Sequence, residues 1–422
     1  MTDVVTRPGI GTPATRGRTM ADVAVPFTLL AVLTCTWNGV SVAGLQLVDL
    51  FLVIAVALIT LDSLTGTRRL WVPRWVGIAT FVILGLAVLH VFMPAPESYL
   101  SGRFTLLNVE AVLAQQDGTG GTILIAVRWS IAVIALPLVV AYLVRVSPAL
   151  LGRVGFAWAF GAAISAAVGV ADWFGVTNIG EQLIGGINIA GRQSGLASHA
   201  NNLGFACVIA APIAAHLFRR RPKTAVALLI ALSAGAFATG SRGAQVGMVI
   251  ALLASAIVLK IGRRAIWWTL LVGVVIVFAV AQYAPQVIGD AASLLRFDTV
   301  ATGSSASDLG RDRLGEQARL DFMAYPLAGV GMGVLTAAHS VPLQLAAAGG
   351  LALILGMVIY WGGALRDAWR FRNLETGIGM AAGLSVVLWL TQAIVQNQLV
   401  DRYLYVPVAI IAGVAAIHHR EC

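Results

Sequence analysis

Charged residues are scarce in this chain: Asp, Glu, Lys and Arg together make up 11% of its 422 residues, and 59% are hydrophobic. A soluble globular domain usually carries about 25% charged residues, so the composition argues against that class. Cysteine is scarce too, since the three present (Cys35, Cys207 and Cys422) lie far apart and form no Cys-x-x-Cys motif. This pattern excludes a disulfide framework and a cysteine-based metal site. The net charge of +9 would suggest nucleic acid for a soluble protein, but basic cytoplasmic loops explain it in a membrane protein, and we expect no nucleic-acid partner.

Long apolar stretches recur from Asp22 to the end of the chain. About 20 apolar residues are needed to cross a hydrocarbon core of about 30 Å. We therefore predict an all-α polytopic membrane protein with about twelve spans, forming a single integral membrane domain over residues 1–422. The expected spans are 22–40, 43–61, 75–94, 122–145, 149–172, 196–218, 223–240, 242–260, 265–284, 341–366, 376–396 and 402–419.

The distribution of Lys and Arg predicts how these spans are oriented. Basic residues of membrane proteins concentrate on the cytoplasmic side. With both termini in the cytoplasm, 19 of the 28 Lys and Arg residues fall on that side. A different number of spans in the middle of the chain would place several basic clusters outside. The polar residues 1–20 are then expected to form a disordered cytoplasmic tail.

Nine basic residues break this rule and are expected on the outer face, so each needs an explanation. They are Arg103, Arg128, Arg192, Arg242, Arg296, Arg311, Arg313, Arg319 and Arg402. Several lie in a large extracytoplasmic loop at 285–340, which is too long to be a simple connection and is expected to be functional. We predict a helix within this loop, at 308–324.

Arg242 is the most informative of the nine. It lies in Thr239-Gly240-Ser241-Arg242-Gly243-Ala244, at the expected outer start of a helix. An arginine there opposes the helix dipole, whereas a phosphate would be held by the arginine, Ser241 and the open backbone N–H groups. An arginine that reaches the membrane surface, or pairs with a distant Asp, would give the same pattern.

A second outer junction has the same composition. Arg192 lies in a Gly-Arg segment just before Ser198-His199-Ala200-Asn201-Asn202. Two such arginines could hold one pyrophosphate, because guanidinium groups offer paired donors to phosphate oxygens. For His199, Asn201 and Asn202, helix capping and hydrogen bonding between helices is the favoured alternative.

Other polar residues have more than one interpretation. Asp308, Asp312 and Glu316 form an acidic row that could bind a divalent cation, but a solvated face with i, i+3 pairs to Arg311 and Arg319 is favoured. His339, at the end of the outer loop, could be a general base or an interfacial residue bonded to backbone. Asp49 is an isolated acid inside a span, and the sequence does not indicate its role.

The ordered set of these motifs resembles the bacterial O-antigen ligase and polymerase superfamily over residues 190–360. Ser340 departs from the family, which often has Asn there. The set consists of Arg192, His199-x-Asn201, Thr239-Gly240-Ser241-Arg242-Gly243-Ala244, Gly310-Arg311, Pro326-x-x-Gly329-x-Gly331-x-Gly333, His339, Gln344 and Gly349-Gly350.

The resemblance implies a membrane glycosyltransferase of the C-type (GT-C-like) fold in the bacterial cytoplasmic membrane, with its active site outside. Such enzymes move a glycan from a polyprenyl-pyrophosphate carrier to a lipid or glycan acceptor, with inversion and without a metal or other cofactor. Arg192 and Arg242 would hold the pyrophosphate, with Ser241 and Asn201 beside them. Arg311 and Arg319 of the loop helix would also bind substrate. His339 would be the base.

Several other functions remain open at this point. A polysaccharide polymerase uses the same donor, so the sequence does not separate it from a ligase, and it names neither sugar nor acceptor. A SEDS-type glycosyltransferase would place a catalytic Asp in an outer loop. A secondary transporter would be expected to have an internal repeat and ionisable residues near the middle of the bilayer.

Overall fold

The computed structural model describes residues 19–42, 45–66, 68–103, 119–184, 192–260, 306–335, 338–373, 377–396 and 398–419. Most of the expected tail (residues 1–18), the expected span at 265–284 and the first part of the expected outer loop (285–305) lie outside these ranges. The described chain is almost entirely helical, and its one β-hairpin pairs Ser41 with Gln46.

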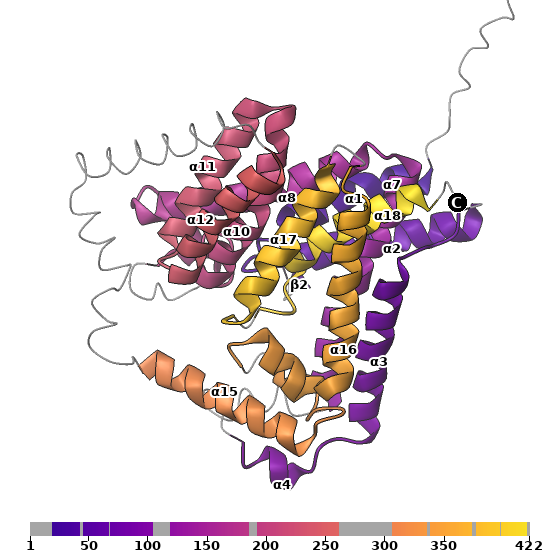
Figure 1. The fold of residues 1–422 in the computed structure, drawn as a ribbon, viewed down its shortest axis with the longest axis vertical. Helices are drawn as coiled ribbons and strands as arrows, with labels where there is room; N and C mark the ends of the chain where they lie inside the picture. Colours follow the sequence, from indigo (N-terminus) through magenta and orange to yellow (C-terminus); the bar gives the residue numbers. More distant parts are fainter. Residues whose placement is uncertain are drawn as a thin grey trace, which may run out of the picture.

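Figure 1 shows how the described elements are arranged. They are α1 (Met20–Thr34), β1 (Ser41–Val42), β2 (Leu45–Gln46), α2 (Leu47–Thr65), α3 (Arg74–Phe92), α4 (Glu97–Leu100), α6 (Thr119–Ser130), the π-helix η1 (Ile131–Ala135), α7 (Leu136–Val146), α8 (Leu150–Trp173), α9 (Ile179–Ile184), α10 (Ala200–His216), η2 (Leu217–Arg219), α11 (Pro222–Ala238), α12 (Arg242–Val258), α15 (Ala306–Ala324), η3 (Met332–Val334), α16 (Val341–Arg370), α17 (Ile378–Ala393), η5 (Arg402–Tyr405) and α18 (Val406–His418).

Six helical segments of the described chain are long and apolar enough to cross a membrane. They are Leu47–Thr65, Arg74–Phe92, Ile123–Val146, Leu150–Trp173, Ala200–Arg219 and Val341–Arg370. Five shorter apolar helices accompany them, at Met20–Thr34, Pro222–Ala238, Arg242–Val258, Ile378–Ala393 and Arg402–His418. Helices therefore occupy, within a few residues, every expected span except the one at 265–284. The structure is that of an all-α membrane protein.

Helix α10 lies among α8, α11, α12 and α17, and most of its side chains are buried (Figure 1). Small residues bring these helices close together. A Cβ atom at Gly204 of α10 would lie 2.5 Å from the Cβ of Ala244 in α12. A Cβ at Gly235 of α11 would lie 2.3 Å from the Cβ of Ala166 in α8. Close packing of this kind holds membrane helices together, and here it places the starts of α10 and α12 side by side.

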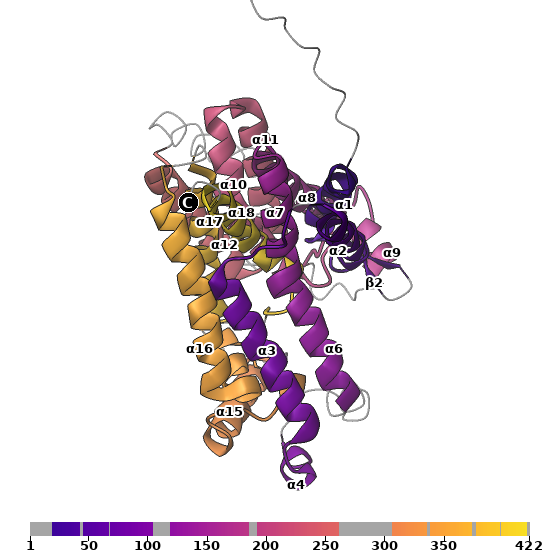
Figure 2. The same ribbon diagram turned by 90° about the vertical axis from the view of Figure 1, so that its right-hand side faces the viewer.

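Helices α3 and α16 run side by side in both views (Figures 1 and 2), and α6 lies next to α3 in Figure 2. Helix α15 crosses the end of this group and packs on α16. Trp75 and Asp367 link α3 to α16 at the other end, because the indole Nε1 donates to the carboxylate at 2.8 Å. The predicted loop helix at 308–324 is thus present, and it begins at Ala306.

The structure differs from the expected span at 341–366 in one respect: α16 is broken at Gly350. The backbone there has φ of +59° and ψ of −154°, which is not helical and favours glycine. The N–H groups that the break releases, on Leu351 and Ala352, donate to the carbonyls of Pro326 and Leu327 at 2.8 and 3.1 Å. Residues 341–349 therefore form a separate short helix, and the membrane-length helix begins after the break.

Candidate functional site

The loop before α10 is fixed to the end of α11 through Arg192. Its Nε donates to the carbonyl of Thr239 at 2.9 Å, and the N–H of Gln193 donates to the carbonyl of Ala238 at 3.1 Å. The last carbonyls of a helix lack partners within it, so these contacts also complete α11. Arg192 Nη2 donates to Oδ1 of Asn201 at 2.5 Å, in the first turn of α10. Arg192 thus joins the two outer junctions that the sequence singled out.

The rest of this loop is fixed to α8 and to the segment after α1. The N–H of Leu196 donates to Oγ of Ser165 in α8 at 3.0 Å, and its carbonyl accepts from the N–H of Gly39 at 3.1 Å. The N–H of Ser198 donates to Oδ1 of Asn38 at 2.9 Å. These contacts fix the chain at the point where α10 begins.

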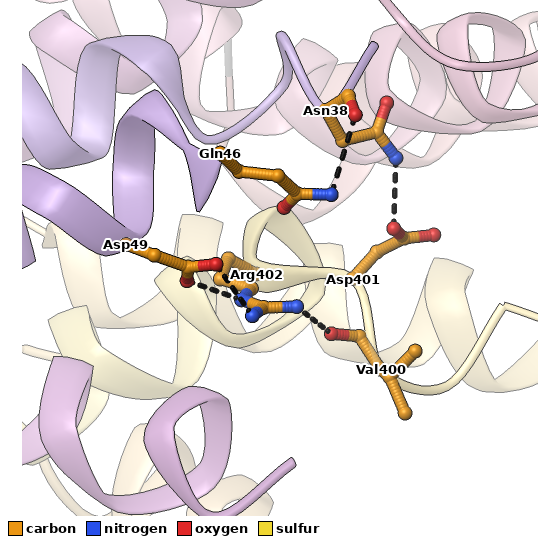
Figure 3. A network of polar contacts seen from close by, with 6 residues as sticks. All are labelled: Asn38, Gln46, Asp49, Val400, Asp401 and Arg402. Atoms are coloured by element: carbon orange, nitrogen blue, oxygen red, sulfur yellow. Dashed lines mark hydrogen bonds and ion pairs between the residues drawn. The ribbon is translucent and has the colours of Figure 1, made fainter. Parts of the chain in front are cut away.

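Asn38 belongs to a polar network that also holds the segment before α18 (Figure 3). Its Nδ2 donates to Oδ1 of Asp401 at 2.7 Å. The next residue, Arg402, is 2% exposed, and its Nε and Nη2 each donate to a carboxylate oxygen of Asp49 at 2.8 Å. Its Nη1 donates to the carbonyl of Val400 at 3.1 Å. Asp49, which the sequence left unexplained, is therefore the partner of one of the nine outer arginines.

A second chain of contacts closes this network around the start of α10. Ser198 Oγ accepts from Nδ2 of Asn202 at 3.0 Å. Asn202 Oδ1 accepts from Nε2 of Gln398, and Gln398 Oε1 accepts from the hydroxyl of Tyr403 at 2.6 Å. Because Gln398 and Tyr403 flank Asp401, the contacts form a ring that ties α10 to the residues before α18. Hydrogen bonding between helices, the alternative that the sequence favoured for Asn202, is confirmed.

Two histidines, the exposed His199 and the half-buried His339, share one electrostatic environment. Nδ1 of His199 accepts the N–H of Asn201 at 3.1 Å and caps α10. Burial lowers the pKa of His199 below its usual 6.5, and the charges of Arg192 and Arg311 lower this pKa further. Burial is also the largest cause that lowers the pKa of His339, and electrostatic interactions with Arg311 and then with His199 lower this pKa further. Residues from the loop before α10, from α15 and from the start of α16 therefore act on one another in one place.

The start of α12 adjoins this place through Thr239. The Thr239 carbonyl is held by Arg192, and its Oγ1 accepts the N–H of Ser241 at 3.2 Å. Gly240 has φ of +58°, which lets the chain reverse between α11 and α12. Ser241 is buried but its side chain does not cap the helix, and Arg242, the first residue of α12, is exposed. Arg242 thus lies three residues from a group that Arg192 contacts.

Helix α15 is fixed to the segment after α4 by a buried carboxylate, Asp321. It accepts from Arg103 Nε and Nη2 at 3.0 and 2.7 Å, from the Tyr99 hydroxyl at 3.1 Å and from Gln317 Nε2 at 3.0 Å. Burial, followed by the charge of Asp321, raises the pKa of Tyr99 to about 12. A second outer arginine is thereby explained as structural.

On the exposed face of α15, Arg319 pairs with Glu316 at 2.6 Å. This is the i, i+3 pair that the sequence favoured over a cation-binding row, and it is confirmed. Asp312 is also exposed, and the side chain of Asp308 lies outside the described residues. The sequence also predicted that Arg319 binds substrate, and this stays a prediction for a side chain that here pairs with Glu316.

Of the predicted site residues, Arg192, Arg311 and His339 all lie within electrostatic range of His199, and Arg242 is three residues along the chain from Thr239, whose carbonyl Arg192 contacts. Sequence reasoning missed His199. A histidine at the first position of a helix suggested a cap, and it is one, but a capping ring can still face a site with its other nitrogen.

Within the described residues no group of three His, Cys, Asp or Glu is arranged to hold a metal ion. The chain matches no protein-family model, and a search of curated proteins finds no match. The functional argument therefore depends on the geometry and charge of the site.

Proposed function

We propose that this protein is a glycosyltransferase on the outer face of a bacterial cytoplasmic membrane, which moves a glycan from a polyprenyl-pyrophosphate carrier to an acceptor hydroxyl. The observation that supports this best is the shared environment of Arg192, Arg311, His199 and His339. The neighbouring cations oppose protonation of both histidines, and the same positive potential favours an anion. Pyrophosphate carries several negative charges, and guanidinium groups can bind its oxygens in pairs.

The start of α12 adds further groups for the same anion. The N–H groups in the first turn of a helix have no partner within it, and the helix dipole favours negative charge there. Because the Ser241 side chain does not cap α12, those N–H groups remain open to a ligand. Arg242 follows directly and would contribute its charge, while Asn201 keeps Arg192 in position.

In this mechanism the bond between the sugar C1 and the carrier oxygen breaks, and its electron pair moves onto the leaving phosphate. The acceptor oxygen attacks C1 from the opposite face, so the configuration inverts. Arg192 and Arg311 stabilise the developing negative charge, which is usually the largest catalytic effect. His339 is neutral at pH 7 because its pKa is lowered, and it takes the acceptor proton, a contribution of about 10²–10⁴-fold. The proposed mechanism involves no metal ion or other cofactor.

The proposed arrangement is GT-C-like, with about twelve spans, both termini in the cytoplasm and the prenyl chain in the bilayer beside the helices. Helix α15 carries Arg311 and packs on α16. We propose that α15 covers the site and excludes water, which would otherwise hydrolyse the donor.

A polymerase would use the same donor and the same site, so it remains the alternative. A SEDS-type enzyme would need an outer catalytic Asp. Asp321 and Asp401 are engaged in buried hydrogen bonds with Arg103 and Asn38, so neither of these two is placed to serve as that Asp. A transporter is the alternative with the most different expected outcome, since it should accumulate an anion and form no glycan product.

In the test, the purified full-length protein in lipid nanodiscs is supplied with a polyprenyl-pyrophosphate glycan and a lipid acceptor. The product is identified by mass spectrometry. One addition to the acceptor indicates a ligase, and a ladder indicates a polymerase. Arg311→Ala should reduce turnover at least about 100-fold. Arg313→Ala is the matched control, because two positions along a helix place a side chain on nearly the opposite face.

Equal activity of Arg311→Ala and Arg313→Ala would contradict the assignment of the site. The proposal as a whole fails if the wild-type protein forms no product and instead accumulates a labelled anion in sealed vesicles.

A further inference from the structure

His199 presents only one of its two ring nitrogens to the site. Nδ1 accepts the backbone N–H of Asn201 at 3.1 Å, and this contact caps α10. A neutral imidazole has one N–H group and one nitrogen lone pair. Because the cap uses the lone pair of Nδ1, the proton is assigned to Nε2. His199 can therefore donate a hydrogen bond at Nε2 but cannot accept one there.

Protonation of His199 would break the hydrogen bond that caps α10, since the imidazolium ion has no nitrogen lone pair to accept the N–H of Asn201. The charged groups that face the ring add to this cost: Arg192 from the loop before α10 and Arg311 from α15. Both cations, together with burial, lower the pKa of His199. His199 is thus held as a neutral ring whose tautomer is set by the backbone.

Hydrogen bonds place this ring next to Arg192, because Asn201 accepts from Arg192 Nη2 at 2.5 Å and donates its backbone N–H to His199 Nδ1 at 3.1 Å. Arg192 and Arg311 act on His199, whereas Arg311 and His199 act on His339. His199 therefore lies within electrostatic range of Arg192, Arg311 and His339. Among the described residues none forms a hydrogen bond with Nε2 of His199, and His199 is exposed.

We propose that His199 donates a hydrogen bond from Nε2 to the pyrophosphate of the donor lipid, and that His339 alone takes the acceptor proton. This inference rests on the proposed glycosyl transfer. The neighbouring guanidinium groups place an anionic oxygen beside His199, and a neutral donor adds a directed hydrogen bond to it. The two histidines then have different roles, because the backbone fixes the tautomer of His199 and leaves His339 free to accept a proton.

Three substitutions of His199 distinguish its role as a hydrogen-bond donor at Nε2 from its role as the cap of α10. His199→Asn keeps an oxygen near the position of Nδ1, and Asn is a preferred capping residue, but its side chain does not reach the position of Nε2. His199→Gln reaches that position with an N–H group and caps poorly. His199→Ser is a second capping variant without a donor at Nε2, which keeps the test decisive if Asn disturbs the loop.

The measurements are the thermal unfolding midpoint, the affinity for polyprenyl pyrophosphate without a glycan, and turnover. His199→Asn should unfold at the wild-type temperature and lose about 10- to 100-fold in affinity and turnover, as for a hydrogen bond to a charged group. His199→Gln should unfold earlier yet recover part of the turnover.

Wild-type affinity and turnover in both His199→Asn and His199→Ser would overturn the inference and leave His199 as a cap only. If the wild-type protein binds the carrier and transfers the glycan, that result concerns His199 alone. If the wild-type protein does neither, the proposed function fails, and the inference fails with it.

Discussion

Asp49→Asn is expected to destabilise the protein more than any other single change in the polar network of Figure 3. The substitution leaves the charge of Arg402, which is 2% exposed, buried without a counter-charge, and the amide oxygen of Asn can accept only one of the two hydrogen bonds at 2.8 Å. Two unit charges about 4 Å apart attract by about 4 kcal/mol at an effective dielectric constant of 20. Removing one partner of a buried pair costs about 3–5 kcal/mol, because the remaining charge is left uncompensated.

The assay is unfolding of the full-length protein in mixed micelles of a mild detergent and dodecyl sulfate, followed by tryptophan fluorescence. Asp49→Asn should lower the free energy of unfolding by about 3–5 kcal/mol. The double variant Asp49→Asn with Arg402→Met should recover most of that loss, because no charge remains buried without a partner. Glu316→Gln, which breaks the exposed pair with Arg319, is the control and should have no measurable effect.

The reasoning is refuted if Asp49→Asn loses less than about 1 kcal/mol, the range of an exposed pair. It is also refuted if the double variant is as unstable as Asp49→Asn alone. The first result would mean that water reaches Arg402. The second would mean that Asp49 stabilises α2 through contacts other than this ion pair.

Three further predictions follow from the same geometry. Asn38→Asp and Asp401→Asn should each reduce turnover, because each breaks the contact that fixes the loop before α10. The double variant should restore turnover, since the introduced carboxylate can accept a hydrogen bond from the introduced amide, and a double variant as inactive as the single variants would contradict this. Gly350→Ala should lower the thermal midpoint, because φ of +59° strains any other residue by about 1–3 kcal/mol, whereas Gly362→Ala, with no atom within 4 Å of its Cβ position, should not. The value of kcat/KM should be constant above pH 6.5 and fall as the pH drops through the lowered pKa of His339 in the free enzyme, and a limb of kcat/KM above pH 6.5 would exclude it as the base.

The helices could be predicted from the sequence because each must supply about 20 apolar residues, and hydropathy measures that requirement directly. The break at Gly350 could not be predicted in the same way. Gly and Pro are frequent in membrane helices, so Gly349-Gly350 in an apolar stretch is not a distinctive pattern. The break depends on hydrogen bonds to Pro326 and Leu327, and the sequence gives no measure of that approach.

The site was only partly predictable for a related reason. The outer arginines stood out because they break the charge distribution of membrane proteins, and this drew attention to Arg192, Arg242 and Arg311. The same rule does not tell a structural arginine from a binding one. Arg402 and its partner Asp49 are separated by 353 positions, so no local pattern connects them.

The two histidines also indicate how an anion would change the site once it is bound. A cation beside a histidine opposes its protonation, and an anion favours it, so binding and protonation are linked in both directions. The lowered pKa of His339 should therefore rise when a pyrophosphate occupies the place next to Arg311. This rise would improve His339 as a base, since a catalytic base works best with a pKa near the working pH. The acid limb of kcat, which reports the substrate complex, should then lie at a higher pH than that of kcat/KM, which reports the free enzyme. If the two limbs coincide, the anion does not bind within the electrostatic range of His339, and the pyrophosphate has to be placed elsewhere.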